Sequence, residues 1–220
     1  MSNKPINIGV IGVGHLGIHH VKHYANIPNV NLLGIYDPDI KRSNHVAKKY
    51  KTVVYQNLEK LIKDANALSV VTPTPNHFKT AKLCLENKRH VFIEKPITVT
   101  LEEANKLIEL SKNNSVIIQV GHIERLNPAL MALKPYDISP KFIEIQRLAP
   151  YTVRGTDVPV VLDKMIHDID ILLSLVKSEV SSLEATGMSI ITSSLDMAHA
   201  RIQFKNGATA SLMSSRIAQN

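Results

Sequence analysis

Residues 6–17 read INIGVIGVGHLG, an apolar run that leads directly into the pattern GxGxxG. In such a loop the first glycine permits a tight turn, the second lets a pyrophosphate approach the backbone, and the third lets a helix pack closely on the strand. The helix that follows offers free N–H groups and the positive end of its dipole to phosphates. The pattern therefore predicts a strand, a phosphate-binding loop and a helix. The residues expected at a dinucleotide are Gly12, Gly14, His15 and Leu16.

An acidic residue follows at the distance that such a loop requires. The second apolar run ends in Asp37, 20 residues past Gly17, where a carboxylate would bond the adenosine ribose hydroxyls. A carboxylate there also repels a 2′-phosphate, so the sequence favours NAD over NADP, although Arg42 nearby would weaken that preference. The alternative is a glycine turn without any ligand, and the strand, loop, helix and acid together argue against it.

Short β-branched apolar runs alternate with longer amphipathic stretches as far as Gly121. Strands separated by helices of this length imply βαβ units and a parallel sheet. A helix start is marked where Thr100 and Glu103 form a capping box. Residues 1–121 are therefore expected to form an α/β Rossmann domain that binds NAD. Its strands are expected at Ile6–Ile11, Val30–Tyr36, Ala67–Val71, His90–Ile93 and Ser115–Val120.

The pattern changes after Gly121. Lys141–Leu148 alternates between apolar and polar residues, as a half-buried strand does. Asn206-Gly207 lies between two further strand-like runs and is a strong hairpin signal. With a long helix at Val161–Val176, these strands predict an α+β domain with a mostly antiparallel sheet over residues 122–220. This second domain is expected to bind the substrate and to be incomplete, because the sequence stops directly after a strand-like run.

Composition argues against several classes of protein. The chain has 220 residues, 44% of them hydrophobic, and no apolar run near the roughly 20 residues of a membrane helix. Its net charge is +7, but the basic residues are scattered among acids and form no base-reading motif, so no nucleic-acid partner is expected. Cys84 is the only cysteine, which excludes an intrachain disulfide and suits a reducing cytoplasm.

Histidines crowd the helix that follows the glycine loop. His15, His19 and His23 recur at intervals of four residues, which is the spacing of zinc ligands on a helix. That helix holds no carboxylate or cysteine to complete a site. No metal is therefore expected, and packing or plain exposure is the preferred interpretation of these histidines.

Two further motifs suggest a family. Residues 71–77 read VTPTPNH, and the fourth expected strand leads into Glu94-Lys95-Pro96. With the glycine loop, these motifs resemble the glucose–fructose oxidoreductase / inositol dehydrogenase / rhizopine-catabolism (Gfo/Idh/MocA) family over essentially the whole chain. The resemblance implies that Lys95 reaches the nicotinamide ribose and the reacting hydroxyl, and that the bond before Pro96 is cis. It also implies cofactor contacts from Thr72, Pro73, Asn76, His77 and Glu94.

A second signature of this family falls in Asp163–Asp170, within the long predicted helix. Asp163, His167 and Asp170 form a polar stripe beside an apolar one. Spacing alone favours a solvated helix face. The resemblance instead implies that Asp163, His167 and Lys95 are catalytic. His167 would take the hydroxyl proton, Asp163 would orient His167, and Lys95 would stabilise the alkoxide while hydride moves to NAD⁺.

Two loops narrow the resemblance to a subgroup. Residues 121–128 read GHIERLNP and residues 149–158 read APYTVRGTDV. Together with the opening of the first helix, they resemble bacterial UDP-N-acetylglucosamine 3-dehydrogenases, which make a 3-oxo sugar on the route to lipid A. A nucleotide sugar carries a pyrophosphate, which an arginine can bind with two hydrogen bonds. The expected substrate-binding residues are Arg125, Asn127, Arg147, Tyr151 and Arg154.

Other interpretations stay open. Each arginine by itself could form an ordinary surface salt bridge, and the substrate could be a polyol or a free sugar handled by the same family. A protein that binds NAD without catalysis, as a sensor or a scaffold, is the alternative outside enzymes. Family members normally continue with more strands, and these often form a dimer face. A homo-oligomer built through the C-terminal sheet is therefore expected.

Overall fold

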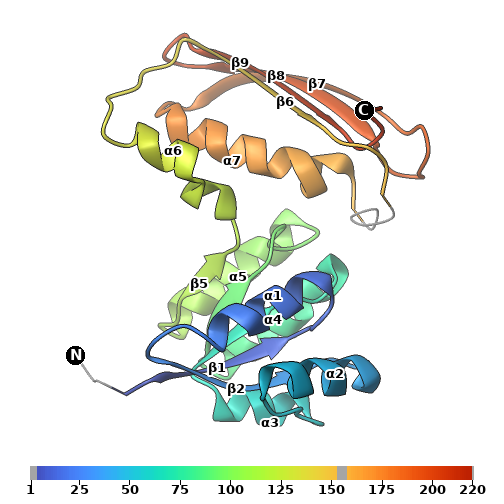
Figure 1. The fold of residues 1–220 in the computed structure, drawn as a ribbon. Coiled ribbons are helices and arrows are strands. Elements are labelled where there is room, and N and C mark those ends of the chain that lie inside the picture. The colour runs from blue at the N-terminus through green and yellow to red at the C-terminus, as the bar shows by residue number, and fades with distance from the viewer. Residues whose placement is uncertain (1–3, 153–157, 220) are drawn as a thin grey trace. The chain divides into compact units, whose positions relative to one another are not determined.

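The computed structural model describes residues 4–152 and 158–219 of the chain. The chain divides into two compact units, residues 1–121 and residues 122–220, each with a sheet of its own (Figure 1). Within the described ranges, no helix is both long enough and apolar enough to cross a membrane.

The N-terminal unit contains a five-stranded parallel sheet in the order β2-β1-β3-β4-β5. The predicted Rossmann arrangement is therefore confirmed. The direction in which strands are added reverses at β1, and doubly wound sheets bind ligands at such a switch point, outside the carboxyl ends of the strands. The strands are β1 (Ile6–Ile11), β2 (Val30–Tyr36), β3 (Ala67–Val70), β4 (His90–Ile93) and β5 (Ile118–Val120).

Helices connect these strands, and several begin at a capping side chain. Asp39 accepts a hydrogen bond from the backbone N–H of Arg42 at 3.0 Å. Thr100 accepts one from the N–H of Glu103 at 3.3 Å, which is one of the two bonds of the predicted capping box. The helices are α1 (His15–Tyr24), α2 (Ile40–Tyr50), α3 (Leu58–Asp64), α4 (His77–Glu86) and α5 (Leu101–Asn113), with a 3₁₀ turn, η1 (Thr74–Asn76), before α4.

The parallel sheet separates two apolar cores, because successive residues of a strand point to opposite faces. One core joins α3, α4 and α5 through the fully buried side chains of Leu61, Cys84 and Leu107. The other core joins α1 and α2 through Val21 and Val46. The sheet is thus covered on both faces, as its nearly continuous apolar strands predict.

The C-terminal unit has a four-stranded sheet in the order β6-β9-β8-β7. The pairs β7–β8 and β8–β9 are antiparallel, and β6 runs parallel to β9, so the predicted mostly antiparallel sheet is confirmed. The predicted turn at Asn206-Gly207 joins β8 to β9. The strands are β6 (Phe142–Leu148), β7 (Val180–Met188), β8 (Met197–Phe204) and β9 (Thr209–Ser215), and two short helices, η2 (Ile123–Leu126) and α6 (Pro128–Leu133), precede them.

The segment expected to be one helix at Val161–Val176 is not a single α-helix. It begins as a π-helical turn, η3 (Val161–Met165), and continues as α7 (Ile166–Leu175). Such turns are rare and occur frequently at functional sites. Asp163 lies in the π-helical turn and His167 lies in α7, so regular α-helical spacing does not describe their arrangement.

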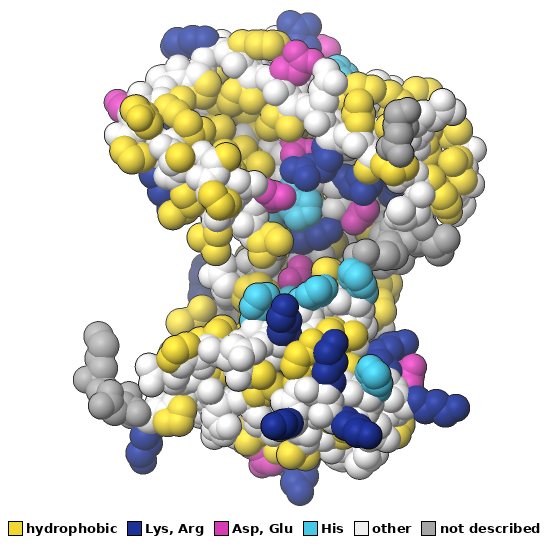
Figure 2. Space-filling model, in the orientation of Figure 1, with side chains coloured by type: hydrophobic (Ala, Val, Ile, Leu, Met, Phe, Trp, Pro, Cys, Tyr) yellow, Lys and Arg dark blue, Asp and Glu magenta, His cyan; other side chains and the backbone are white. Residues whose placement is uncertain are grey.

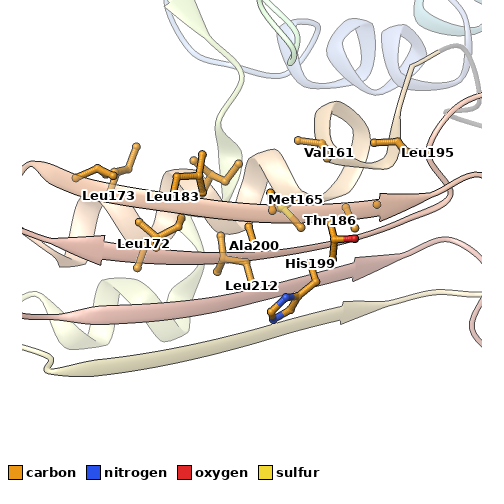
Figure 3. A pocket seen from close by; sticks show the side chains of 16 residues that line it. Val161, Met165, Leu172, Leu173, Leu183, Thr186, Leu195, His199, Ala200 and Leu212 are labelled. Carbon is orange, nitrogen blue, oxygen red and sulfur yellow. The ribbon is translucent and has the colours of Figure 1, made fainter.

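The sheet of the C-terminal unit is covered unevenly. Leu172 of α7 is fully buried against the sheet, whereas β7 is exposed along its whole length. An apolar cavity of about 440 Å³ lies against the helix-facing side of β7 and β8 (Figure 3). Its lining includes Met165, Leu173, Leu183, Thr186, His199 and Leu212.

Candidate functional site

The glycine loop follows β1 and has the geometry of a phosphate cradle. Gly12 has a φ of +90°, and a Cβ there would lie 2.6 Å from the carbonyl oxygen of Val71, just after β3. A Cβ at Gly17 would lie 2.0 Å from the carbonyl oxygen of Gly12, so only glycine lets α1 approach the loop. Around Gly14, where a Cβ would meet nothing within 4 Å, there is open space beside the N-terminus of α1. This space suits a pyrophosphate.

Asp37 lies directly after β2 and is only 5% exposed. Its Oδ2 accepts a hydrogen bond from the N–H of Val13 at 2.8 Å, and its Oδ1 accepts one from the N–H of Asp39 at 2.9 Å. The carboxylate therefore also holds the glycine loop in shape, which goes beyond its predicted role at the ribose. Arg42 Nη1 lies 3.5 Å from Asp37 Oδ1, and its Nη2 lies 3.2 Å from Asp39 Oδ2. Two carboxylates therefore already balance the positive charge of this guanidinium.

The loop between β3 and α4, together with the first residue of α4, carries four of the predicted cofactor contacts. His77 is 1% exposed, with Nδ1 2.8 Å from the carbonyl oxygen of Pro96 and Nε2 2.8 Å from that of Thr72. His77 thus ties this loop to the loop after β4. The Thr72 hydroxyl is buried without a hydrogen-bond partner among the described residues, a costly state that a bound ligand would relieve. Pro73 and Asn76 close the turn η1 with a hydrogen bond of 2.9 Å.

The motif Glu94-Lys95-Pro96 follows β4, and the peptide bond between Lys95 and Pro96 is cis, as predicted. Glu94 Oε1 lies 3.0 Å from His20 Nε2, and Glu94 Oε2 accepts the Lys95 N–H at 3.2 Å. Burial would raise the pKa of Glu94, but the hydrogen bond and charge of His20, together with the contacts of Lys95, hold that pKa below its usual value. Glu94 is therefore ionised at neutral pH, beside the lysine that is predicted to be catalytic.

His20 is a site residue that the histidine spacing in α1 did not indicate. His15 and His19 are exposed, and their rings meet edge to face with centroids 5.6 Å apart. Among the described residues, no group of three or more potential ligands could hold a metal ion. A different signal could have identified His20: it lies between Gly17 and Tyr24 on the side of α1 that faces the sheet.

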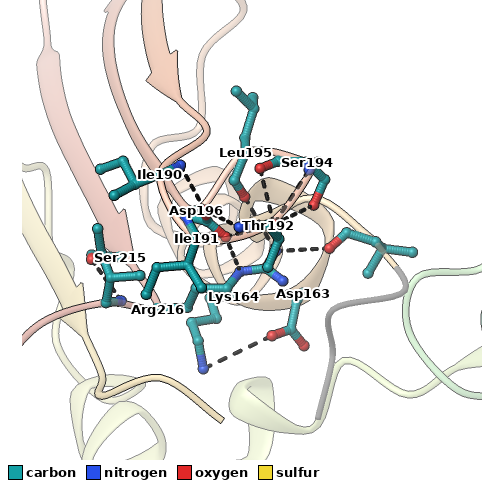
Figure 4. A network of polar contacts seen from close by, with 12 residues as sticks. Asp163, Lys164, Ile190, Ile191, Thr192, Ser194, Leu195, Asp196, Ser215 and Arg216 are labelled. Carbon is teal, nitrogen blue, oxygen red and sulfur yellow. Dashed lines mark hydrogen bonds and ion pairs between the residues drawn. The ribbon is translucent and has the colours of Figure 1, made fainter. Parts of the chain in front are cut away.

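In the C-terminal unit, Asp163 lies in η3 with its Oδ2 3.8 Å from Lys164 Nζ (Figure 4). His167 follows in the first turn of α7. Lys95 belongs to the N-terminal unit, so the three residues predicted to be catalytic are contributed by both units. Their common role stays a prediction.

Arg125 and Arg147, which are predicted to bind the substrate, each hold a carboxylate of α7. Arg125 donates from Nε and Nη2 to the two oxygens of Asp170 at 2.8 and 2.5 Å. Arg147 donates from Nε and Nη2 to Asp168 Oδ1 at 2.9 and 2.7 Å. These hydrogen bonds are the main reason why the pKa of each guanidinium group is raised. A substrate phosphate would have to share both arginines with these carboxylates.

Asp170 connects this cluster to His167. The hydrogen bond from Arg125 is the main cause that holds the pKa of Asp170 below its usual value, and the nearby charges of His122 and His167 act in the same direction. An ionised carboxylate near His167 would stabilise the protonated imidazole. The polar stripe of this helix is therefore part of a cluster of opposite charges, and Figure 2 shows acidic, basic and histidine side chains side by side on this unit.

The remaining predicted substrate residues differ in how well they are fixed. Asn127 Oδ1 accepts the N–H of Ala129 at 3.0 Å and caps α6, while its Nδ2 donates to Glu124 Oε2 at 3.0 Å. Tyr151 is 41% exposed. Arg154 lies outside the described residues. The roles of all three in substrate binding stay predictions.

A buried carboxylate organises the loop between β7 and β8 (Figure 4). Asp196 is fully buried, and its Oδ2 accepts the N–H groups of Ile190, Ile191 and Thr192 at 2.8, 2.6 and 2.8 Å. Burial would raise the pKa of Asp196, but the bonds from Thr192 and from the other two N–H groups hold that pKa well below its usual value. The loop is therefore built around an ionised carboxylate.

The same loop is tied to the start of η3. Arg216, 2% exposed, donates from Nη2 to the carbonyl oxygens of Val158 and Leu195 at 2.7 and 3.2 Å. The N–H of Val160 donates to the carbonyl oxygen of Leu195 at 2.9 Å. These bonds fix the chain directly before the turn that carries Asp163. The sequence gives no local signal for them, because their partners are far apart along the chain.

Two family models match the chain. One is described as the oxidoreductase family with an NAD-binding Rossmann fold, and it matches residues 6–122. The other is the GFO/IDH/MocA C-terminal domain, and it matches residues 149–220.

Known proteins resemble the chain over most of its length. UDP-N-acetylglucosamine 3-dehydrogenase of Acidithiobacillus ferrooxidans is 37% identical over 95% of this chain and 66% of the relative. The scyllo-inositol 2-dehydrogenase (NAD(+)) of Bacillus subtilis is 28% identical over 96% of this chain and 67% of the relative. The solved structure of the Acidithiobacillus enzyme, GnnA, matches with a TM-score of 0.93 and 36% identity, covering 98% of this chain and 71% of that one. The chain thus spans about two thirds of the length of these curated relatives.

Proposed function

The chain belongs to the Gfo/Idh/MocA family of oxidoreductases, and from this premise we propose that it is an NAD-dependent dehydrogenase of a sugar hydroxyl. The proposed substrate is UDP-N-acetylglucosamine, oxidised at the 3-hydroxyl to a 3-oxo sugar. The observation that carries this choice is the 37% identity, over 95% of the chain, to a relative named for that reaction. The inositol dehydrogenase of Bacillus subtilis is 28% identical.

The N-terminal unit would hold the cofactor. The open space at Gly14 and the N-terminus of α1 would receive the pyrophosphate, and the Asp37 carboxylate would bond the adenosine ribose. The buried Thr72 hydroxyl supports this assignment, because it has a hydrogen bond to offer a ligand. NAD⁺ supplies the hydride acceptor when it is bound.

Removal of the hydroxyl proton and stabilisation of the alkoxide would depend on His167, Asp163 and Lys95. His167 would take the proton of the substrate hydroxyl, and Asp163 would orient His167. The Asp170 carboxylate, held ionised by Arg125, favours this role, since it stabilises the imidazolium that forms. Lys95 would stabilise the developing alkoxide by its charge and by a hydrogen bond.

One observation favours a second candidate substrate class. Arg125 and Arg147 are both paired with carboxylates, which weakens their attraction for a pyrophosphate. A polyol or a free sugar would not need them. A polyol dehydrogenase of the same family is therefore the alternative.

The choice between these substrates is tested by following absorbance at the NADH band with purified protein, NAD⁺ and each sugar in turn. UDP-N-acetylglucosamine should give a sustained rise when an aminotransferase and glutamate remove the ketone, and His167→Ala should lower the rate by about a hundredfold or more. A rise with inositol or glucose and none with UDP-N-acetylglucosamine would favour the alternative substrate class. Binding of NAD⁺ without turnover of any sugar would instead indicate a non-catalytic sensor or scaffold.

The proposed setting follows from the proposed substrate. We propose that the enzyme works in the cytoplasm, and that an aminotransferase converts its product to a 3-amino sugar for lipid A.

We also propose a homo-oligomer through the sheet of the C-terminal unit, where Phe142 and Leu148 are 62% and 50% exposed. Sedimentation analysis of the wild-type protein and of Phe142→Glu tests the oligomer, and a wild-type monomer would contradict it.

A further inference from the structure

A series of polar contacts joins Ser69, His20 and Glu94 in the N-terminal unit. His20 Nδ1 lies 2.8 Å from Ser69 Oγ, and His20 Nε2 lies 3.0 Å from Glu94 Oε1. Ser69 is fully buried in β3. A neutral imidazole satisfies both of its contacts when Nε2 donates to the carboxylate and Nδ1 accepts from the serine hydroxyl.

The Glu94 carboxylate is enclosed on further sides. Its Oε2 accepts the Lys95 N–H at 3.2 Å, and a Cβ at Gly121 would lie 3.1 Å from both carboxylate oxygens. The titratable groups facing Glu94 among the described residues are His20 and Tyr24 from α1 and Lys95 from its own loop. Because the side chain is only 12% exposed, it has little access to water, and its position depends on these partners.

We propose that His20 is a positioning residue for the dehydrogenase reaction: its imidazole fixes the Glu94 carboxylate, which fixes the backbone from which Lys95 projects. The inference rests on the proposed function, because the position of Lys95 matters only if Lys95 meets the reacting hydroxyl. In this role His20 acts through Glu94 and Lys95 and does not touch the substrate.

Two substitutions separate this role from simple packing. The amide of glutamine reaches the position of the histidine Nε2, so His20→Gln keeps a donor toward Glu94. The amide of asparagine reaches only the position of Nδ1, so His20→Asn keeps the side toward Ser69 and loses that donor. Both remove the ring contact with Phe92, whose centroid lies 5.4 Å from that of His20. A packing role predicts the same loss for both. His23→Asn, at an exposed position of α1, is the control.

The first readout is the titration of Glu94 itself, followed by NMR of protein labelled with [5-¹³C]glutamate and assigned with Glu94→Gln. In His20→Asn the midpoint should rise above the wild-type value, because burial still disfavours the carboxylate and the bond that offset it is gone. In His23→Asn the midpoint should stay near the wild-type value. In His20→Gln it should rise less than in His20→Asn, because the glutamine amide keeps the hydrogen bond to Glu94 and loses only the charge of His20. Equal midpoints in the wild type and His20→Asn would overturn the proposal.

The second readout is turnover with NAD⁺ and UDP-N-acetylglucosamine. In His20→Asn, kcat should fall about tenfold to a hundredfold while KM for the sugar stays within about twofold, and His20→Gln should recover most of kcat. An equal loss in both variants would overturn the positioning role. If the wild-type protein reduces no NAD⁺ with any sugar, the proposed function fails, whereas the NMR midpoints still decide whether His20 controls Glu94.

Discussion

At the scale of single residues, glycine meets two different needs in this chain. Gly207 has a φ of +83°, and a Cβ there would meet open space, so the backbone conformation alone demands glycine. Gly14 has a φ of −66° and is also surrounded by open space, so the fold itself does not demand glycine there. The space beside Gly14 is therefore available to a ligand.

Substitution by alanine should separate these two needs. Gly207→Ala should lower the free energy of unfolding by about 1 kcal/mol and leave the affinity for NADH unchanged. Gly14→Ala should keep the free energy of unfolding within about 0.5 kcal/mol and weaken NADH binding about tenfold or more, because the methyl group occupies the pyrophosphate position. Urea unfolding and NADH fluorescence measure the two effects. An unchanged NADH affinity in Gly14→Ala would contradict the phosphate site.

His77→Phe tests whether His77 holds together the loops that follow β3 and β4. Phenylalanine fills the buried space but has no ring N–H to donate to the carbonyl oxygen of Thr72 or to that of Pro96, so the free energy of unfolding should fall by about 1–3 kcal/mol. Urea unfolding measures the change. His45→Phe, at an exposed position of α2, is the matched control and should change little. Equal stability of both variants would show that His77 does not tie the loops.

At the scale of elements, local patterns account for the strands better than for the helix of the C-terminal unit. Val30–Tyr36 is a mostly apolar run bounded by turn residues, and it forms a strand where the pattern places it. The π-helical turn Val161–Met165 carries the same apolar stripe as an α-helix. Its start is fixed by the bond between Val160 and Leu195, a partner far away in the sequence that periodicity cannot indicate.

The loop built around Asp196 predicts a pH dependence of stability. The pKa of Asp196 is lower in the folded chain than in the unfolded one, so its stabilising contribution is complete above the unfolded pKa near 4 and is lost as the pH falls toward the folded value. Asp196→Asn should therefore be less stable than the wild type at pH 7, and the difference should shrink below about pH 4. Urea unfolding of both proteins across this range measures it, with Asp137→Asn, at an exposed position, as control. A difference that stays constant with pH would show that the ionised Asp196 carboxylate does not stabilise the fold.

At the scale of the whole molecule, the sequence predicts what depends on spacing and misses what depends on packing. The glycine loop and Asp37 are recognisable because each lies at a fixed distance along the chain. The bond of His20 to Glu94, and the pairing of Arg147 with Asp168, join residues 74 and 21 positions apart. Such pairs are set by how helices pack on sheets, and no local pattern encodes them.

We propose that the chain moves hydride from carbon 3 of UDP-N-acetylglucosamine to NAD⁺. Mass spectrometry of the reduced cofactor tests it most directly, with substrate deuterated at carbon 3 and substrate deuterated at carbon 2 as the control. We expect deuterated NADH from the first substrate and unlabelled NADH from the second. Unlabelled NADH from both, or no NADH while the cofactor still binds, would contradict it.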